Sequence, residues 1–231
     1  MSLRDYQEQD VQYMLRALAA PSPVDRVAFN LNEPGLGKTV EGAAVIGRLP
    51  AERPALVVCP TGVRAAWQEE LARWAPDREV VIPEDTFSLR RPDAGQVTIV
   101  GFDQLGAMRP PKPVLASLLR DHSKKKKLAE AQLAQAKAWD LHRRREQSQA
   151  SLRDLLPGTV LVADEVHYAK GARTARSLAL EELWKDACRP RGGAYLPLSG
   201  TIDPRDPVDL WVALEVAGVA LRVWPGGITA C

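Results

Sequence analysis

The sequence has few cysteines and no long apolar run, and these shortages exclude several classes of protein. Its three cysteines, Cys59, Cys188 and Cys231, are widely spaced and include no CxxC pair, so we expect neither a disulfide framework nor a zinc site. The longest apolar stretches are about six residues, whereas a helix needs roughly 20 to cross a bilayer. No basic segment followed by an apolar one opens the chain, which argues against a secretory signal. We therefore expect a cytoplasmic protein with reduced, buried cysteines and no membrane partner.

The composition predicts a folded domain. Of the 231 residues, 45% are hydrophobic and 26% are charged, which is ordinary for a globular protein and excludes a mainly disordered or collagen-like chain. At roughly 100–200 residues per domain, residues 1–231 form one large domain, or one domain that carries an insertion.

Charge is distributed unevenly along the chain. The formal net charge is +2, but residues 120–147 hold nine Lys or Arg against four Asp or Glu, so the rest of the chain is mildly acidic. A polycationic segment on an acidic body favours an anionic partner such as nucleic acid. A solvated helical face is the alternative interpretation.

Short apolar runs alternate with helical patterns, which predicts an α/β fold with a mostly parallel sheet. Several of the runs are continuously apolar, as expected for strands that helices cover on both faces. Strands are expected at 27–31, 55–59, 97–102, 159–163 and 194–198, with a short one at 80–82, and helices at 39–48, 62–74, 172–187 and 207–216. Within the helix at 62–74, Trp67 and Trp74 share an apolar stripe with Leu71, which predicts that both tryptophans pack in the core.

Residues 106–157 do not fit this alternation and resemble an insertion between two core strands. The segment begins with a proline-rich stretch at 109–113, and apolar residues then recur at helical spacing at 128, 131, 134, 138 and 141. This pattern predicts a long, weakly amphipathic helix. If the segment contacts nucleic acid, the candidate residues are Lys124, Lys125, Lys126, Lys127, Arg143, Arg144 and Arg145.

Residues 32–39, Asn-Glu-Pro-Gly-Leu-Gly-Lys-Thr, predict a phosphate-binding loop because they follow an expected strand and open an expected helix. Glycines let the backbone N–H groups approach phosphates at a helix N-terminus, and a lysine reaches the β- and γ-phosphates. The candidate nucleotide-binding residues are Gly35, Leu36, Gly37, Lys38 and Thr39, with the Thr39 hydroxyl on Mg²⁺. Asn32 stands where the general pattern has its first glycine.

A second motif places two carboxylates at the end of an apolar strand. Asp164 and Glu165 follow residues 159–163, and acids at the end of a buried strand are costly unless they serve a site. Beside a phosphate-binding loop, Asp164 would hold Mg²⁺, partly through water, and Glu165 would orient or deprotonate the attacking water. Lys38, Asp164 and Glu165 are therefore the candidate catalytic residues.

Five motifs in this order resemble the first motor lobe of the superfamily-two helicases, and most closely the Swi/Snf-type DNA translocases. They are Leu-Arg-Asp-Tyr-Gln at 3–7, residues 32–39, Leu-Val-Val-Cys-Pro at 56–60 with Trp67 and Glu70, Asp-Glu-Val-His at 164–167, and Leu-Ser-Gly-Thr at 198–201 with Asp-Leu-Trp at 209–211. The family's loop, Asp-Glu-Met-Gly-Leu-Gly-Lys-Thr, also lacks the first glycine, which accounts for Asn32.

The resemblance implies a RecA-like domain that binds ATP, Mg²⁺ and nucleic acid, DNA rather than RNA. Gln7 would read the adenine, and the turn at Pro60, Thr61 and Gly62 would contact the DNA backbone. Ser199, Gly200 and Thr201 would couple the nucleotide state to the DNA face. Residues 100–105 depart from the family's hydroxyl-bearing segment, so the DNA contacts expected there do not carry over.

The resemblance also implies a two-lobe motor of which this chain holds one lobe. The family's second lobe, which carries an arginine finger, has no counterpart after residue 211. We therefore expect efficient hydrolysis to need a second lobe on a separate polypeptide. Two alternatives are a non-catalytic nucleic-acid- or partner-binding module derived from such a lobe, and a small P-loop kinase. Gln7, the Asp-Glu-Val-His segment and the lack of a lid segment argue against the kinase.

Overall fold

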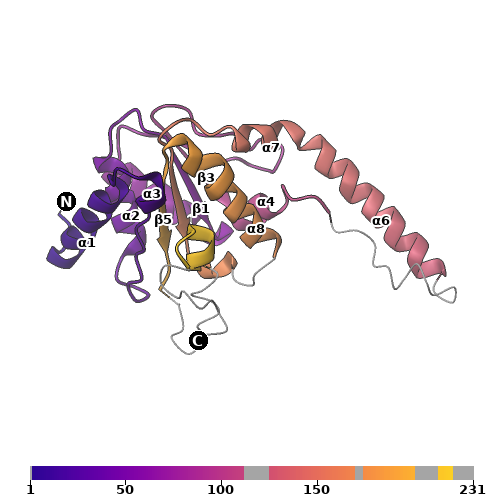
Figure 1. The fold of residues 1–231 in the computed structure, drawn as a ribbon, viewed down its shortest axis with the longest axis horizontal. Coiled ribbons are helices and arrows are strands. Elements are labelled where there is room, and N and C mark those ends of the chain that lie inside the picture. The colour runs from indigo at the N-terminus through magenta and orange to yellow at the C-terminus, as the bar shows by residue number, and fades with distance from the viewer. Residues whose placement is uncertain (1, 112–124, 170–173, 201–212, 221–231) are drawn as a thin grey trace.

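A five-stranded parallel sheet forms the centre of the molecule (Figure 1). The computed structural model describes residues 2–111, 125–169, 174–200 and 213–220. The strand order is β2-β3-β1-β4-β5. The strands are β1 (Ala55–Cys59), β2 (Glu79–Val81), β3 (Gln96–Gly101), β4 (Val160–Asp164) and β5 (Ala194–Leu198). Every residue of β1, β4 and β5 is buried, which explains their continuously apolar sequences.

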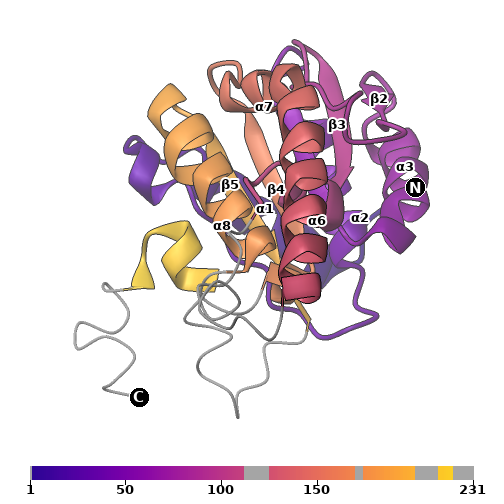
Figure 2. The ribbon, with the colours of Figure 1, turned by 90° about the vertical axis from the view of Figure 1, so that its right-hand side faces the viewer.

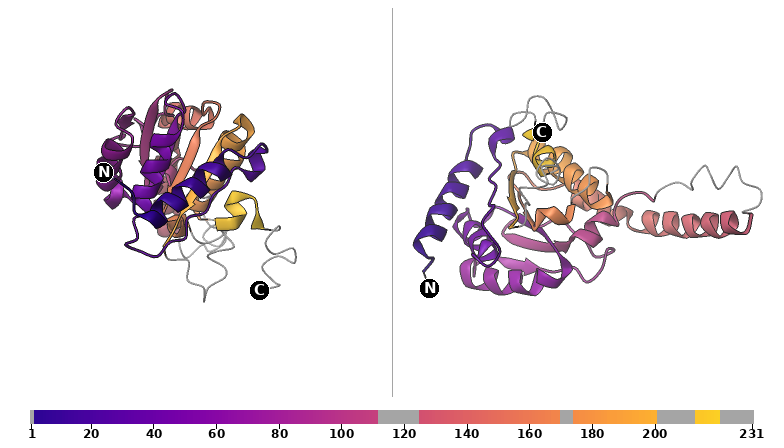
Figure 3. Two further views of the ribbon diagram at one scale, coloured as in Figure 1. Left: turned by 90° about the vertical axis from the view of Figure 1, so that its left-hand side faces the viewer. Right: turned by 90° about the horizontal axis from the view of Figure 1, so that it is seen from below.

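Helices cover both faces of the sheet, and this confirms the expected α/β architecture (Figures 1 and 3). One buried cluster joins the sheet to α1 (Asp5–Leu18), α2 (Lys38–Arg48) and α3 (Arg64–Trp74). The other joins the opposite face to α4 (Phe102–Gly106), α7 (Glu146–Arg153) and α8 (Ala175–Glu182). The expected strands and the helices at 39–48 and 62–74 are present, with bounds shifted by at most two residues, except for the strand at 27–31.

The prediction of a regular strand at 27–31 is wrong, and a proline in the neighbouring strand β5 explains why. The segment runs parallel to the outer edge of β5 but forms only two isolated bridges among the described residues, Val27 with Tyr195 and Asn30 with Leu198. The N–H groups of Ala28 and Asn30 donate to the carbonyls of Tyr195 and Pro197. Pro197 has no N–H to return a bond, so the ladder is interrupted between the two bridges.

Three further helical regions differ from expectation. Helix α1 was not predicted as a helix, although Gln7, Val11, Met14 and Leu18 are buried at helical spacing. Helix α8 begins three residues later than expected and continues as a π-helix over Leu183–Cys188. Of the expected helix at 207–216, residues 207–212 lie outside the described part, and residues 213–217 are helical.

The insertion contains the long helix that its spacing predicts. Helix α6 (Lys125–Arg144) extends away from the body of the molecule, and α7 leads back to it (Figures 1 and 2). Leu133, Trp139 and Leu141 of α6 are exposed. Within the described residues, no helix is both long and apolar enough to cross a bilayer.

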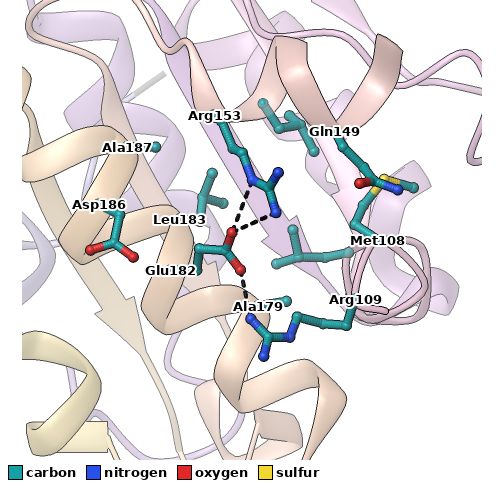
Figure 4. A pocket seen from close by; sticks show the side chains of 11 residues that line it. Met108, Arg109, Gln149, Arg153, Ala179, Glu182, Leu183, Asp186 and Ala187 are labelled. Atoms are coloured by element: carbon teal, nitrogen blue, oxygen red, sulfur yellow. Dashed lines mark hydrogen bonds and ion pairs between the residues drawn. The ribbon is translucent and has the colours of Figure 1, made fainter. Parts of the chain in front are cut away.

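Ion pairs anchor the base of the insertion to α8. The carboxylate of Glu182 lies between two guanidinium groups, 2.6 Å from Nη1 of Arg109 and 2.9 Å from Nη2 of Arg153 (Figure 4). Arg109 precedes the insertion helix and Arg153 ends α7, so one carboxylate holds both ends of the insertion. The same residues line a cavity of about 230 Å³ with an apolar floor.

Candidate functional site

The predicted phosphate-binding loop, before α2, contains two glycines in the left-handed conformation. Gly35 and Gly37 have φ angles of +86° and +91°, in the left-handed region that favours glycine. A Cβ atom at Gly37 would lie 2.5 Å from Nε2 of Gln7, so a side chain there would be strained by its conformation and would displace the Gln7 amide. Gly37 immediately precedes α2, and the loop's N–H groups are therefore at a helix N-terminus, where anions bind.

Lys38 is buried at the start of α2, with 7% of its surface exposed. Its Nζ donates hydrogen bonds to the carbonyls of Asn32 at 2.9 Å and Glu33 at 3.3 Å. A Cβ atom at Gly200 would lie 2.5 Å from the same Nζ. The segment after β5 therefore packs directly against the lysine, and Thr39 follows it in the first turn of α2.

Gln7 connects α1 to this loop. Its Nε2 donates to the carbonyl of Leu36 at 3.1 Å, and its Oε1 accepts the N–H of Arg4. The hydroxyl of Tyr6 donates to the same Leu36 carbonyl at 2.9 Å. Gln7, Leu36 and Trp74 line an open cavity of about 340 Å³. The predicted adenine-reading residue therefore lies beside the predicted phosphate-binding loop.

Asp164 is the last residue of β4 and is 4% exposed. Burial raises the pKa of its carboxyl group to about 6, although the Trp67 hydrogen bond and the positive charge of Lys38 oppose this rise. The indole Nε1 of Trp67 donates to Oδ2 of Asp164 at 2.7 Å. Trp67 is fully buried, as its apolar stripe predicts, and Trp74 is half-buried.

Glu165 and Ser199 meet at the ring of His167. Nδ1 of His167 lies 3.1 Å from Oε2 of Glu165 and 3.3 Å from Oγ of Ser199. Glu165 has a φ of +53°, an uncommon conformation for a residue with a side chain, which turns the chain sharply at the end of β4. The structure thus joins the Asp-Glu-Val-His segment to the predicted coupling segment. Thr201 lies outside the described residues.

The oxygen donors at this edge of the sheet suit Mg²⁺. The described residues contain no group of three or more His, Cys, Asp or Glu that could hold a metal by themselves. Mg²⁺ needs no such cage, because it is bound by one or two protein oxygens and keeps water and phosphate oxygens as its other ligands. The carboxylate of Asp164 and the hydroxyl of Thr39 fit that requirement.

A buried polar network behind the loop was missed from the sequence. Glu41 of α2 is fully buried, and burial raises the pKa of its carboxyl group. It accepts a hydrogen bond from Nδ2 of Asn30, while Nδ2 of Asn32 lies 2.8 Å from Oδ2 of Asp10 and 3.3 Å from Oε2 of Glu41. An amide at position 32 can donate to both carboxylates, which gives Asn32 a physical role. The sequence signal that could have indicated this network is Glu41 itself, a charged residue within an otherwise apolar stretch of α2.

The candidate nucleic-acid residues are found in two places. Thr61 and Gly62 are exposed in a 3₁₀ turn between β1 and α3, and Pro60 is half-buried before them. In the insertion, Lys127, Arg143 and Arg144 are exposed, and Lys125 and Lys126 belong to the first turn of α6. Lys124 lies outside the described residues.

Arg145 differs from these basic residues because it anchors the insertion. Its Nε donates to Oγ1 of Thr86 at 2.8 Å, and its Nη1 donates to the carbonyl of Ala107 at 3.1 Å. The guanidinium also lies 5.3 Å from the centre of the Phe87 ring. Arg145 thus joins the end of the insertion helix to Thr86 and Phe87 of the body of the protein.

Two curated proteins resemble the chain over short parts of their own length. The human DNA annealing helicase and endonuclease ZRANB3 is 30% identical over 105 residues, which is 40% of this chain and 10% of that protein. The SWI/SNF-related matrix-associated actin-dependent regulator of chromatin subfamily A-like protein 1 of Xenopus tropicalis is 27% identical over 197 residues, 83% of this chain and 15% of that protein.

Solved structures and a family model agree on the fold. The SWI2/SNF2 ATPase core of Sulfolobus solfataricus in complex with dsDNA matches with a TM-score of 0.60 at 20% identity, over 100% of this chain and 41% of that chain. The ATPase core domain from the same organism matches with a TM-score of 0.62 over 96% of this chain and 36% of that chain. The RecA-like fold is therefore that of the SNF2 ATPase core. The model of the SNF2-related domain matches residues 6–189, and the chain belongs to this family.

Proposed function

We propose that this chain is the nucleotide-binding lobe of an SNF2-type DNA translocase, which binds Mg·ATP and DNA and needs a second lobe for efficient hydrolysis. The observation that carries the proposal is the convergence of three segments at one edge of the sheet. Lys38 packs against Gly200, and His167 lies between Glu165 and Ser199, so the loop, the Asp-Glu-Val-His segment and the segment after β5 meet there.

Each of these groups has a role in phosphoryl transfer. The N–H groups from Gly35 to Lys38 bind phosphate oxygens at the N-terminus of α2, and the Lys38 ammonium neutralises the β- and γ-phosphates. Thr39 and Asp164 would hold Mg²⁺, which when bound supplies positive charge to neutralise the phosphates. Glu165 orients the attacking water. His167, whose Nδ1 lies 3.1 Å from Glu165 and 3.3 Å from Ser199, would connect the water-orienting acid to the coupling segment.

Nucleotide binding is tested with Lys38→Ala. A fluorescent ATP analogue is titrated against the wild type, Lys38→Ala and the control Lys185→Ala, which removes a lysine paired with Glu181 on the far face of the sheet. We expect Lys38→Ala to weaken binding at least about tenfold and the control to match the wild type, because only Lys38 lies in the loop. Equal affinity in all three proteins would remove the phosphate-binding assignment.

The need for a second lobe is supported by how little of a complete motor the chain matches. It covers 41% of the Sulfolobus solfataricus ATPase core. An arginine finger supplied by another lobe contributes about 10³–10⁵ in rate. We therefore expect the chain alone to bind ATP but hydrolyse it very slowly, with little stimulation by DNA.

Steady-state ATPase measurements with and without DNA test this second part. Addition of a polypeptide that carries the second lobe should restore DNA-stimulated turnover, and Glu165→Gln should abolish it again. Strong DNA-stimulated turnover by the monomer would contradict the need for another lobe. Nucleotide binding without turnover in any mixture would favour the non-catalytic binding module.

DNA is the proposed nucleic acid for two reasons. One structural neighbour is described as a complex with dsDNA, and one relative is named a DNA annealing helicase. The exposed turn at Thr61 and Gly62 has open space around it, since no heavy atom lies within 4 Å of a Cβ atom placed at Gly62. Competition between duplex DNA and duplex RNA of the same length measures the preference.

A further inference from the structure

The side chains of Trp67 and Asp164 form a buried hydrogen bond beside the proposed magnesium site. Nε1 of Trp67 lies 2.7 Å from Oδ2 of Asp164, and the two residues are 0% and 4% exposed. A hydrogen bond to a buried carboxylate is stronger than one in water, because the local dielectric constant is low. The bond therefore favours one orientation of the carboxylate.

The indole ring itself has little freedom to move. A Cβ atom at Gly42 of α2 would lie 2.7 Å from Cη2 of Trp67 and 3.3 Å from Cδ1 of Leu198. The absence of a side chain at Gly42 thus makes room for the ring between α2 and the sheet. A ring confined in this way presents its N–H group in a fixed direction.

This position links the two elements that carry the magnesium ligands. Gly42 is one turn after Lys38 and Thr39 on α2, and Asp164 ends β4. The same ring packs on α2 at Gly42 and donates to Asp164. It therefore sets both the spacing of the two elements and the orientation of the carboxylate. The backbone N–H of Glu165 also hydrogen-bonds this carboxylate, so two donors of the chain hold it at the end of β4.

We propose that Trp67 is a positioning residue for magnesium, which acts by orienting Asp164 through its indole N–H. The inference rests on the proposed nucleotide-binding function. It predicts a specific defect, namely weaker use of Mg²⁺ with unchanged binding of nucleotide in the absence of metal. Residues that hydrogen-bond to a metal ligand typically contribute about 10–100-fold to metal affinity.

The test uses Trp67→Phe, which removes the N–H group and keeps an aromatic ring. Binding of a fluorescent ATP analogue is measured in EDTA and then during a Mg²⁺ titration. We expect the Mg²⁺ concentration at half-saturation to rise by about tenfold or more, with affinity in EDTA within about twofold of the wild type. The matched control is Trp184→Phe, which removes an indole hydrogen bond to the carbonyl of Ala217 on the other face of the sheet.

Asp164→Asn shows whether Trp67 acts through Asp164. In the Asp164→Asn background, Trp67→Phe should cause no further change in Mg²⁺ dependence. The positioning role would be overturned if Trp67→Phe left the Mg²⁺ concentration at half-saturation unchanged. It would also be overturned if the variant lost as much affinity for the ATP analogue in EDTA as in Mg²⁺. Either result would leave the proposal of nucleotide binding intact. A wild type that binds no nucleotide would overturn the proposed function and this inference together.

A second measurement covers the case in which Trp67→Phe does not fold. The indole N–H signals of the six tryptophans are recorded by ¹⁵N NMR on the wild type and on Asp164→Asn. We expect one indole signal to move in Asp164→Asn and the same signal to move when Mg²⁺ is added to the wild type with ATP. If no indole signal responds to both changes, the role of Trp67 is refuted.

Discussion

Burial determines the chemistry of Cys59 and Cys188. Both thiols are almost fully buried, and burial raises the pKa of each to about 12. The negative charge of Asp164 also raises the pKa of Cys59, and the Cys188 thiol donates to the carbonyl of Thr159. Because the thiolate is the reactive species, we expect both cysteines to react slowly at neutral pH as long as the protein is folded.

This leads to a prediction for thiol labelling. In a Cys231→Ser variant at about pH 8, we expect no fast reaction with a disulfide reagent, because a pKa of about 12 leaves about one thiolate in ten thousand. After unfolding in guanidinium, two thiols of the Cys231→Ser variant should react. Only one thiol should react in the unfolded double variant Cys188→Ser/Cys231→Ser. Fast labelling of the folded protein would mean that the core around one of these thiols opens readily.

Individual residues also show how far sequence reasoning reaches. The position of the loop at the start of a helix and of the paired carboxylates at the end of a strand was predictable, because each motif directly follows an apolar run. Trp67 was expected in the core, and it is buried there. Its bond to Asp164 was not expected, because helical spacing indicates a buried face but not which polar atom lies opposite. The pairing of Glu41 with Asn30 and Asn32 was not predicted, for the same reason.

At the scale of elements, a single guanidinium group fixes the end of α2. Arg78 is 8% exposed, and burial lowers the pKa of its side chain. The last carbonyls of a helix have no partners within the helix, and Arg78 supplies donors to them and to the chain that follows. The accepting carbonyls are those of Ile46, Leu49, Pro50, Ala51 and Arg53.

We therefore predict a large effect of a conservative change. Arg78→Lys should lower the free energy of unfolding by about 2–4 kcal/mol, because one ammonium cannot satisfy five carbonyls and buried unpaired groups are costly. The exposed Arg73→Lys should change it by less than about 0.5 kcal/mol. Guanidinium denaturation measures both. Similar stabilities for the two variants would show that water replaces the missing donors.

The strand expected at 27–31 shows a second limit of sequence reasoning. An apolar run predicts an extended segment, and the segment is extended beside β5. Whether it forms a regular ladder depends on the partner, and the partner has a proline at position 197. That proline is far from the run in the sequence, so no local pattern could relate the two. The short helix α4 and the π-helical end of α8 likewise depend on packing.

At the scale of the whole molecule, the projecting helix α6 is suited to electrostatic contact with DNA. Lys127, Arg143 and Arg144 are exposed on it. On duplex DNA, the log–log dependence of affinity on salt has a slope of about −0.9 for each neutralised phosphate. Replacement of all three residues by Gln should weaken binding and make the slope less steep by about 0.9 for each phosphate that is no longer neutralised. Fluorescence anisotropy at several salt concentrations measures both effects.

The matched control changes the same number of charges elsewhere. Arg16, Arg48 and Lys185 lie on α1, on α2 and on the π-helical end of α8, outside the insertion, and their replacement by Gln should leave the slope nearly unchanged. If both triple variants behave like the wild type, α6 is the solvated face that its charge pattern also allows. Equal reductions in both would indicate that only net charge matters.

The pairing of residues 27–30 with β5 has a consequence for synthesis of the chain on the ribosome. The segment that leads into the phosphate-binding loop is made early, but its partner strand is completed only at Leu198. A nascent chain that ends before β5 contains β1 to β4, but it lacks the strand against which residues 27–30 lie in the finished domain. The basic insertion emerges before that point. If the chain binds ATP as proposed, ATP would therefore stabilise the domain only after β5 has been synthesised.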